Sequence, residues 1–222
     1  MVKLHNKPML GMGIYTPPDI SLILKVPQSR IRWFIKEVWD NRFGQRVFGE
    51  RYSWDMDNHK AVNFLVLAEF EVVLQLRRSG LSTRRILRAR EAIALDLKQP
   101  YPFATSTLLF HPRKIWYKLE EMAINADESH QLNFLSFVEK YCKRIDFTAN
   151  LASRIWPNGR GKSIVVDPHH QFGQPVINGT NIMAETIYVM HEAGEPISRL
   201  SQLYEVSEKK IQDAIDFYRQ AA

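Results

Sequence analysis

The carboxylate and imidazole side chains that could hold a metal or act as acid and base are few and unfavourably spaced. Asp167, His169 and His170 lie close together in the sequence. They lack the His-Glu-His spacing at i, i+4 that places metal ligands on one helix face. We therefore expect these three residues to form a structural turn and predict no metal site and no cofactor.

The other candidates for chemistry are equally weak. Asp55, Asp57 and His59 alternate just before a helix-like segment, where capping of the helix is favoured over metal binding. Cys142, the single cysteine, ends a predicted helix over Leu132–Cys142 and excludes an intramolecular disulfide. The sequence contains no P-loop, nucleophile elbow or dinucleotide-binding glycine pattern. We expect no enzyme, with a hidden nuclease as the open alternative.

Basic side chains dominate the first part of the chain instead. Thr16, followed by two prolines, predicts the start of a short helix that runs to about Leu24. A second helix is predicted over Gln28–Trp39, with Ile31, Ile35 and Val38 at helical spacing. Two short helices joined by a tight turn form a helix-turn-helix pattern.

The polar positions of the second helix would enter the DNA major groove, where arginine reads guanine or grips phosphate. Phe43–Tyr52, with Gly44 and Gly49 as turn residues, predicts a small wing. Trp33 is predicted to lie in the core. The alternative is a small helical subdomain with solvated charges. The expected DNA-contacting residues are Gln28, Ser29, Arg30, Arg32 and Lys36 on the helix and Arg42 and Arg46 on the wing.

The arginine run, which contains no acidic residue, consists of Arg77, Arg78, Arg84, Arg85, Arg88 and Arg90. It starts at the end of the longest predicted helix, His59–Arg78, which is apolar nearly all round and is ended by Gly80. Ser82 is a predicted N-cap for the next helix, Thr83–Lys98. The run is either a phosphate-facing surface or a solvated helix face. On the first interpretation, Arg84, Arg85 and Arg88 also contact DNA.

Charge separates the chain of 222 residues into two unlike parts. The net charge is +6 and the sequence pI is about 9.4. Residues 163–222 contain eight acidic and four basic residues, so residues 1–162 carry a net charge of +10. A basic N-terminal part and an acidic C-terminal part favour different partners. A polyanion is expected to bind the N-terminal part.

Localisation follows from what the sequence lacks. No run approaches the roughly 18 apolar residues of a membrane span, and no signal peptide is evident. The single cysteine fits a reducing compartment. We expect a cytoplasmic protein without membrane contact.

Breaks in composition suggest the domain organisation. Gln99–Pro102 must end a helix, and Trp156–Lys162 reads as a loop between domains. We therefore expect a winged helix-turn-helix domain with a helical extension over residues 1–98, connecting strands and a helix over 99–162, and a C-terminal domain over 163–222. Strands are predicted over residues 103–120, Arg144–Phe147, Ala149–Ile155 and Ser163–Val166, and C-terminal helices over Ala184–Ala193, from Pro196, and after the N-cap Ser207.

Tyr15–Trp39 resembles the helix-turn-helix of MerR-like regulators. The matching features are Tyr15-Thr16, a helix over Ile20–Leu24, Val26 in the turn, and Arg30-Ile31-Arg32-Trp33. This resemblance implies that the second helix reads DNA and that the unit belongs to a mainly α protein with small β elements.

Val165–Thr180 resembles the opening of the domain of unknown function four-three-three, found in VapB-like antitoxins. The matching features are Asp167-Pro168, Phe172-Gly173-Gln174-Pro175 and Gly179-Thr180. Asn181 and Met183 depart from the family pattern, which often has Gly and Pro there.

These resemblances imply a DNA-binding antitoxin and autorepressor of a type II toxin–antitoxin system. The implied partners are double-stranded DNA of its own operator, a PIN-domain ribonuclease toxin of the VapC kind, and a second copy in a homodimer. The C-terminal domain is net acidic, so dimerisation or toxin contact is favoured there over DNA. A transcription regulator without a toxin and a protein-interaction adaptor stay open as alternatives.

Overall fold

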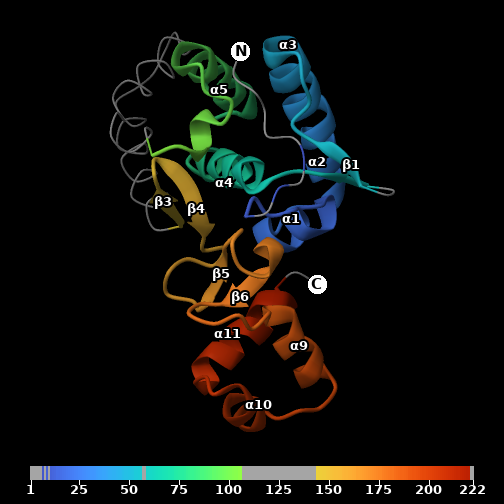
Figure 1. The fold of residues 1–222 in the computed structure, drawn as a ribbon, viewed down its shortest axis with the longest axis vertical. Helices are drawn as coiled ribbons and strands as arrows, with labels where there is room; N and C mark the ends of the chain where they lie inside the picture. The colour runs from blue at the N-terminus through green and yellow to red at the C-terminus, as the bar shows by residue number, and fades with distance from the viewer. Residues whose placement is uncertain (1–6, 8, 10, 57–58, 107–143, 221–222) are drawn as a thin grey trace.

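The computed structural model describes residues 7, 9, 11–56, 59–106 and 144–220. Figure 1 shows an elongated molecule with the helices of residues 17–97 at one end, those of residues 184–219 at the other, and strands between them. A mainly α fold with small β elements, as predicted, is confirmed. Asp57, Cys142, the predicted helix Leu132–Cys142 and the strands expected beyond residue 106 lie outside the described residues.

The first helix, α1 (Pro17–Leu24), begins where its local sequence predicts. The backbone N–H and the hydroxyl of Thr16 both donate to Asp19 Oδ2, at 2.8 and 2.5 Å. A carboxylate in the first turn also suits the positive end of the helix dipole. The helix ends at Lys25, which adopts the left-handed conformation with φ 55°.

The second helix is longer than predicted. α2 (Gln28–Trp33) continues without a break into a π-helix, η1 (Phe34–Gln45), and then α3 (Arg46–Phe48), which ends at Gly49 with φ 74°. The prediction of a wing over Phe43–Tyr52 is wrong. Phe43 is fully buried inside this helix, and a Cβ on Gly44 would overlap the Glu50 carbonyl. Gly44 therefore serves close packing rather than a turn.

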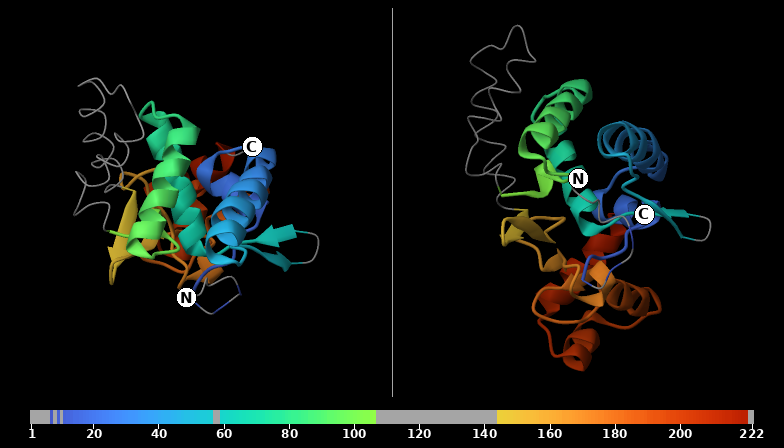
Figure 2. Two further views of the ribbon diagram at one scale, coloured as in Figure 1. Left: turned by 90° about the horizontal axis from the view of Figure 1, so that it is seen from above. Right: turned by 45° about the horizontal axis from the view of Figure 1, so that its top comes forward.

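A two-stranded antiparallel hairpin follows instead, formed by β1 (Trp54–Met56) and β2 (His59–Ala61). Both views of Figure 2 show it projecting from the body of the molecule. The predicted helix over His59–Arg78 therefore starts too early. α4 (Phe64–Arg78) begins after Asn63, whose side chain accepts a hydrogen bond from the Val66 N–H at 3.0 Å.

The core of this end forms where α4 packs against η1 and α5 (Thr83–Leu97), which begins at Ser82 as predicted. The rings of Trp39 and Phe70 stack with their centres 4.2 Å apart. A short 3-10 turn, η2 (Pro102–Ala104), lies across α4 and α5. Stacked aromatic rings of this size contribute much of the apolar area that a core buries.

A four-stranded antiparallel sheet lies between the two ends, with the order β3-β4-β5-β6. Its strands are β3 (Ile145–Thr148), β4 (Leu151–Ile155), β5 (Ile164–Val166) and β6 (Pro175–Ile177), which confirms the first three as predicted strands. Ile155 pairs with Val166, so the sheet crosses the loop Trp156–Lys162 without interruption. Ile145 and Ile155 belong to the first core, while Ile164 and Ile177 belong to a second one.

Three helices close the second core: α9 (Ala184–Glu192), α10 (Ile197–Tyr204) and α11 (Glu208–Arg219). These confirm the predicted C-terminal helices. Pro196 and Ser207 occupy the N-cap positions of α10 and α11. A short turn, η3 (Gln171–Gly173), lies in the connection from β5 to β6.

Candidate nucleic-acid interface

The start of α2 turns one side to the core and a basic side to solvent. Ile31 and Ile35 are each 1% exposed and anchor the helix, as their spacing predicts. The exposed side chains on the other side are Gln28, Ser29, Arg30, Arg32, Trp33 and Lys36. Five of these six are the positions expected to contact DNA.

The turn between α1 and α2 fixes the direction of this surface. Lys25 takes the left-handed conformation that stops α1, and its N–H bonds back to the Ser21 carbonyl. Val26 is buried, and Pro27 at the N-cap starts α2. Three residues therefore separate two packed helices, which is the turn length of a helix-turn-helix.

Few contacts within the protein occupy the donors of the exposed basic residues. Arg32 Nη2 donates to Gln28 Oε1 at 2.9 Å, and Lys36 Nζ lies 3.4 Å from Glu37 Oε1. Both contacts are exposed, where such pairs contribute little. The side chain of Arg30 forms no hydrogen bond or ion pair with another described residue. Its guanidinium is therefore available to phosphate or to a base edge.

Trp33 does not lie in the core as predicted, since 53% of it is exposed. One side of its ring packs edge-on against Phe34 with 5.1 Å between ring centres. The same helix buries Trp39 completely. The exposed Trp33 lies beside Arg30 and Arg32 in sequence and adds an aromatic face to the basic surface.

Arg42 and Arg46 lie on the long helix, not on a wing. Arg42 donates from Nε and Nη2 to Glu91 Oε2, at 3.0 and 2.6 Å, and so joins η1 to α5. This bond neutralises the Arg42 charge. Arg46 is exposed at the start of α3.

The arginines of α5 form a separate group. Arg84 and Arg88 are exposed, and Arg85 is half-buried. In Figure 1, α5 lies at the top of the molecule beside α3, whereas α2 begins lower, next to α1. No hydrogen bond or ion pair within the described residues joins these arginines to the exposed side of α2, so the structure does not bring the two expected groups into contact.

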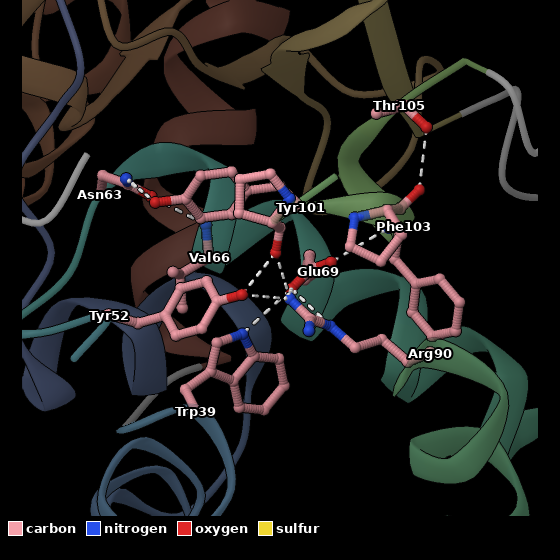
Figure 3. Close-up of polar contacts among 11 residues, drawn as sticks. Trp39, Tyr52, Asn63, Val66, Glu69, Arg90, Tyr101, Phe103 and Thr105 are labelled. Atoms are coloured by element: carbon pink, nitrogen blue, oxygen red, sulfur yellow. Dashed lines mark hydrogen bonds and ion pairs between the residues drawn. The ribbon is translucent and has the colours of Figure 1, made fainter. Parts of the chain in front are cut away.

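Arg90, the last arginine of the run, faces the core. Its side chain is 1% exposed, and its Nη2 lies 2.7 Å from Oε2 of the fully buried Glu69 (Figure 3). The same Glu69 oxygen accepts from Trp39 Nε1 at 3.1 Å, and Glu69 Oε1 accepts from the Phe103 N–H at 3.0 Å. Neither the phosphate-facing nor the solvated interpretation of the run therefore holds for Arg90.

Burial and charge act against each other in this network. Burial, the largest single effect, tends to lower the pKa of Arg90, but the charges and hydrogen bonds of Glu69 and Tyr52 together outweigh it and the pKa is raised. Burial raises the pKa of Tyr52, whose hydroxyl accepts from Arg90 and donates to the Pro100 carbonyl, to about 12. Arg90 is therefore a structural cation. The signal for it was Glu69, one of two carboxylates inside a mostly apolar helix.

Asp167 is fully engaged at the start of the C-terminal segment. It accepts from Arg154 Nε and the His169 N–H, both at 2.9 Å, and lies 3.2 Å from His170 Nδ1. Asp55 and His59, expected to cap a helix, lie on the β1–β2 hairpin instead. Within residues 7, 9, 11–56, 59–106 and 144–220, no three His, Cys, Asp or Glu side chains are grouped to hold a metal ion. Over the same residues, no helix combines the length and apolar character that crossing a membrane requires.

Comparison with known proteins gives the same fold and a partial family match. The crystal structure of Rv2018 from Mycobacterium tuberculosis superposes with a TM-score of 0.74, covering 96% of this chain and 100% of that one at 21% sequence identity. A protein of M. tuberculosis strain H37Rv named "Putative antitoxin VapB45" is 25% identical over 227 residues, which cover 91% of this chain and 92% of that protein. Residues 164–218, from β5 to the end of α11, match the family described as protein of unknown function (DUF433).

Proposed function

We propose that this chain is a DNA-binding antitoxin that represses its own operon in a type II toxin–antitoxin system. The observation that carries the proposal is the relative named as an antitoxin, which aligns over nine-tenths of this chain. The basic, solvent-facing side of α2 supports the DNA-binding part, because major-groove readers present exposed polar and basic side chains on one side of a helix.

In this proposal, residues 1–98 bind DNA and residues 163–222 contact a second copy or the toxin. Residues 99–162 connect these two parts. Gln28, Arg30 and Arg32 lie nearest the bases. Ser29, Lys36, Arg46, Arg84, Arg85 and Arg88 contact phosphates, while Arg42 positions η1 through Glu91. A two-fold dimer would read a palindromic operator.

The toxin in this proposal is a PIN-domain ribonuclease, which the chain would inhibit by covering its active site. The net acidic C-terminal unit is the better surface for contacts with a protein, since it would repel phosphate. A purified PIN-domain nuclease encoded beside this gene should lose RNA cleavage on addition of this protein. Unchanged cleavage at saturating protein would remove the toxin part and leave a regulator.

Fluorescence anisotropy with the protein's own upstream DNA tests the DNA part. We expect specific binding that weakens steeply with salt, compared with a scrambled duplex. Arg30→Ala/Arg32→Ala should abolish the preference for the operator. The matched control is Arg199→Ala/Lys209→Ala, which removes two exposed charges from the acidic end. Equal, weak binding to both duplexes that the first variant leaves unchanged would favour the adaptor instead.

A further inference from the structure

A pocket of about 390 Å³ lies where α1 meets α4, the β4–β5 loop and the end of α11. We call it the joint pocket. Its apolar wall comes from α1 and the loop, and its polar wall contains four cations. The residues that define it are Leu24, Lys25, Glu71, Arg78, Arg144, Pro157 and Lys162. Its volume is in the range of sites for small organic ligands.

Lys25 is half-buried at this joint. Its Nζ donates to the Phe217 carbonyl at 2.6 Å and lies 4.0 Å from the centre of the Phe217 ring. No carboxylate pairs with it within the described residues. Burial lowers its pKa from 10.5 to about 8, so these neutral contacts do not fully replace water around the charge.

Two other cations of the pocket are already paired. Arg144 Nη1 lies 3.2 Å from Glu71 Oε1 and donates to the Pro157 carbonyl at 2.9 Å. Lys162 Nζ lies 2.9 Å from Asp213 Oδ1 and 3.4 Å from Asp216 Oδ2. These pairs cancel the charges of Arg144 and Lys162 and hold the polar wall in place.

Arg78 is the second cation without a partner. Its guanidinium is exposed at the last turn of α4 and forms no hydrogen bond or ion pair with another described residue. Its positive charge opposes the rise that burial causes in the pKa of Glu71. Glu71, which also lines the pocket, is bonded to Gln75 and Arg144. The joint pocket therefore has two cations, Lys25 and Arg78, whose side chains form no ion pair with a described residue, beside the Glu71 carboxylate that Arg144 and Gln75 hold.

We propose that the joint pocket binds the phosphate group of a small organic molecule, with Lys25 and Arg78 as the residues that contact it. A dianionic phosphate matches two unpaired cations, and its oxygens accept charge-assisted hydrogen bonds from both. Leu24 and Pro157 offer apolar contact to the organic part. Because the pocket is lined by α1 and by Gln220 just after α11, a bound ligand would hold the helix-turn-helix unit to the C-terminal unit. Phosphate binding at this site does not depend on the function proposed above.

Inorganic phosphate is the probe for the full-length protein. Thermal unfolding and calorimetric titration at pH 7 should show saturable binding of phosphate, with chloride at equal ionic strength as the reference. We expect Lys25→Met and Arg78→Gln each to weaken phosphate binding by about tenfold, the loss of one charge-assisted contact. Arg78 is exposed, so its variant tests the proposal even if Lys25→Met does not fold.

The chain offers a matched control for each variant. Lys98 ends α5 in the same left-handed conformation in which Lys25 ends α1, and it is exposed. Arg77 precedes Arg78 on α4, is also exposed and does not line the pocket. Lys98→Met and Arg77→Gln should leave phosphate binding unchanged.

Three results would overturn the proposal. The first is stabilisation by phosphate no greater than by chloride. The second is equal loss in the control variants, which would indicate a general effect of charge. The third is DNA affinity that falls in Lys25→Met and Arg78→Gln while phosphate binding stays unchanged, which would assign both cations to nucleic acid.

Discussion

Arg90 and Glu69 form an ion pair at 2.7 Å with 1% and 0% of their side chains exposed. They lie 21 residues apart, on α5 and α4. The guanidinium also lies over the Phe43 ring, 4.2 Å from its centre, so one cation joins α4, α5 and η1. The pair therefore connects the helix that bears the basic surface to the two helices behind it.

Replacing Arg90 with methionine should lower the free energy of unfolding by about 3–5 kcal/mol, because it leaves the Glu69 carboxylate buried without its cation. Urea denaturation measures the change. Arg88→Met, on the exposed side of the same helix, should stay within about 0.5 kcal/mol of wild type. A loss below about 1 kcal/mol in Arg90→Met would mean that the pair does not hold the helices together.

The parts of the fold that local sequence determines were predictable. Thr16 and Ser82 start helices through side-chain contacts within one turn, so their identity suffices. The exposure of Gln28 and Arg30 followed from the period of the apolar residues around them.

The misplaced features depend on contacts between distant segments. From the sequence alone, Gly44 is predicted to be a turn residue. The structure shows instead that the Glu50 backbone lies against it. Trp33 and Trp39 both flank the apolar side of one helix, and only the position of α4 decides that Trp39 is covered and Trp33 is not. From the sequence alone, Arg90 is one of six arginines in a run. Only the position of Glu69 beside it shows that Arg90 is buried.

Gly44→Ala should destabilise the protein by about 1–3 kcal/mol, the usual cost of overpacking. The added Cβ would overlap the Glu50 carbonyl and come within 3.0 Å of the Trp39 carbonyl. Both neighbours are backbone atoms, which cannot move aside cheaply. The gain in helix propensity, up to about 1 kcal/mol, partly offsets this cost.

The control for this glycine is Gly161→Ala in the β4–β5 loop, where a Cβ meets no atom within 4 Å. It should change the unfolding free energy by less than about 1 kcal/mol, in either direction. Equal thermal midpoints for Gly44→Ala and wild type would contradict the close approach of Glu50.

The lowered pKa of Lys25 predicts a pH dependence of stability. Its pKa is about 8 in the folded protein and 10.5 as the reference value, so between these pH values the unfolded chain binds more protons. Wild type should therefore gain stability relative to Lys25→Met as pH rises from about 7 to 9.5. Burial raises the pKa of Tyr52 and Tyr218, which places their titration above this window.

Urea denaturation at several pH values measures this difference, with Lys98→Met as the control. The control curve should run parallel to wild type over the same range. If the difference between wild type and Lys25→Met stays constant with pH, the Lys25 ammonium is as well solvated in the folded protein as in the unfolded chain.

The contacts of Arg30 and Arg42 predict different effects on DNA binding, although both arginines lie on one continuous helix. Arg30 has free donors, whereas Arg42 gives Nε and Nη2 to Glu91. If the basic side of α2 contacts DNA, Arg30→Ala should weaken operator binding by about tenfold or more, as the loss of a base contact or a charged phosphate contact does. Arg42→Ala should leave the affinity and the slope of log K against log salt unchanged, because the Arg42 charge is already neutralised.

Anisotropy titrations over a salt series distinguish the two variants, since each lost phosphate contact lowers the slope by about 0.9. An equal reduction of the slope in both variants would show that Arg42 leaves Glu91 to bind DNA, and the ion pair would then be a switch rather than a fixed support.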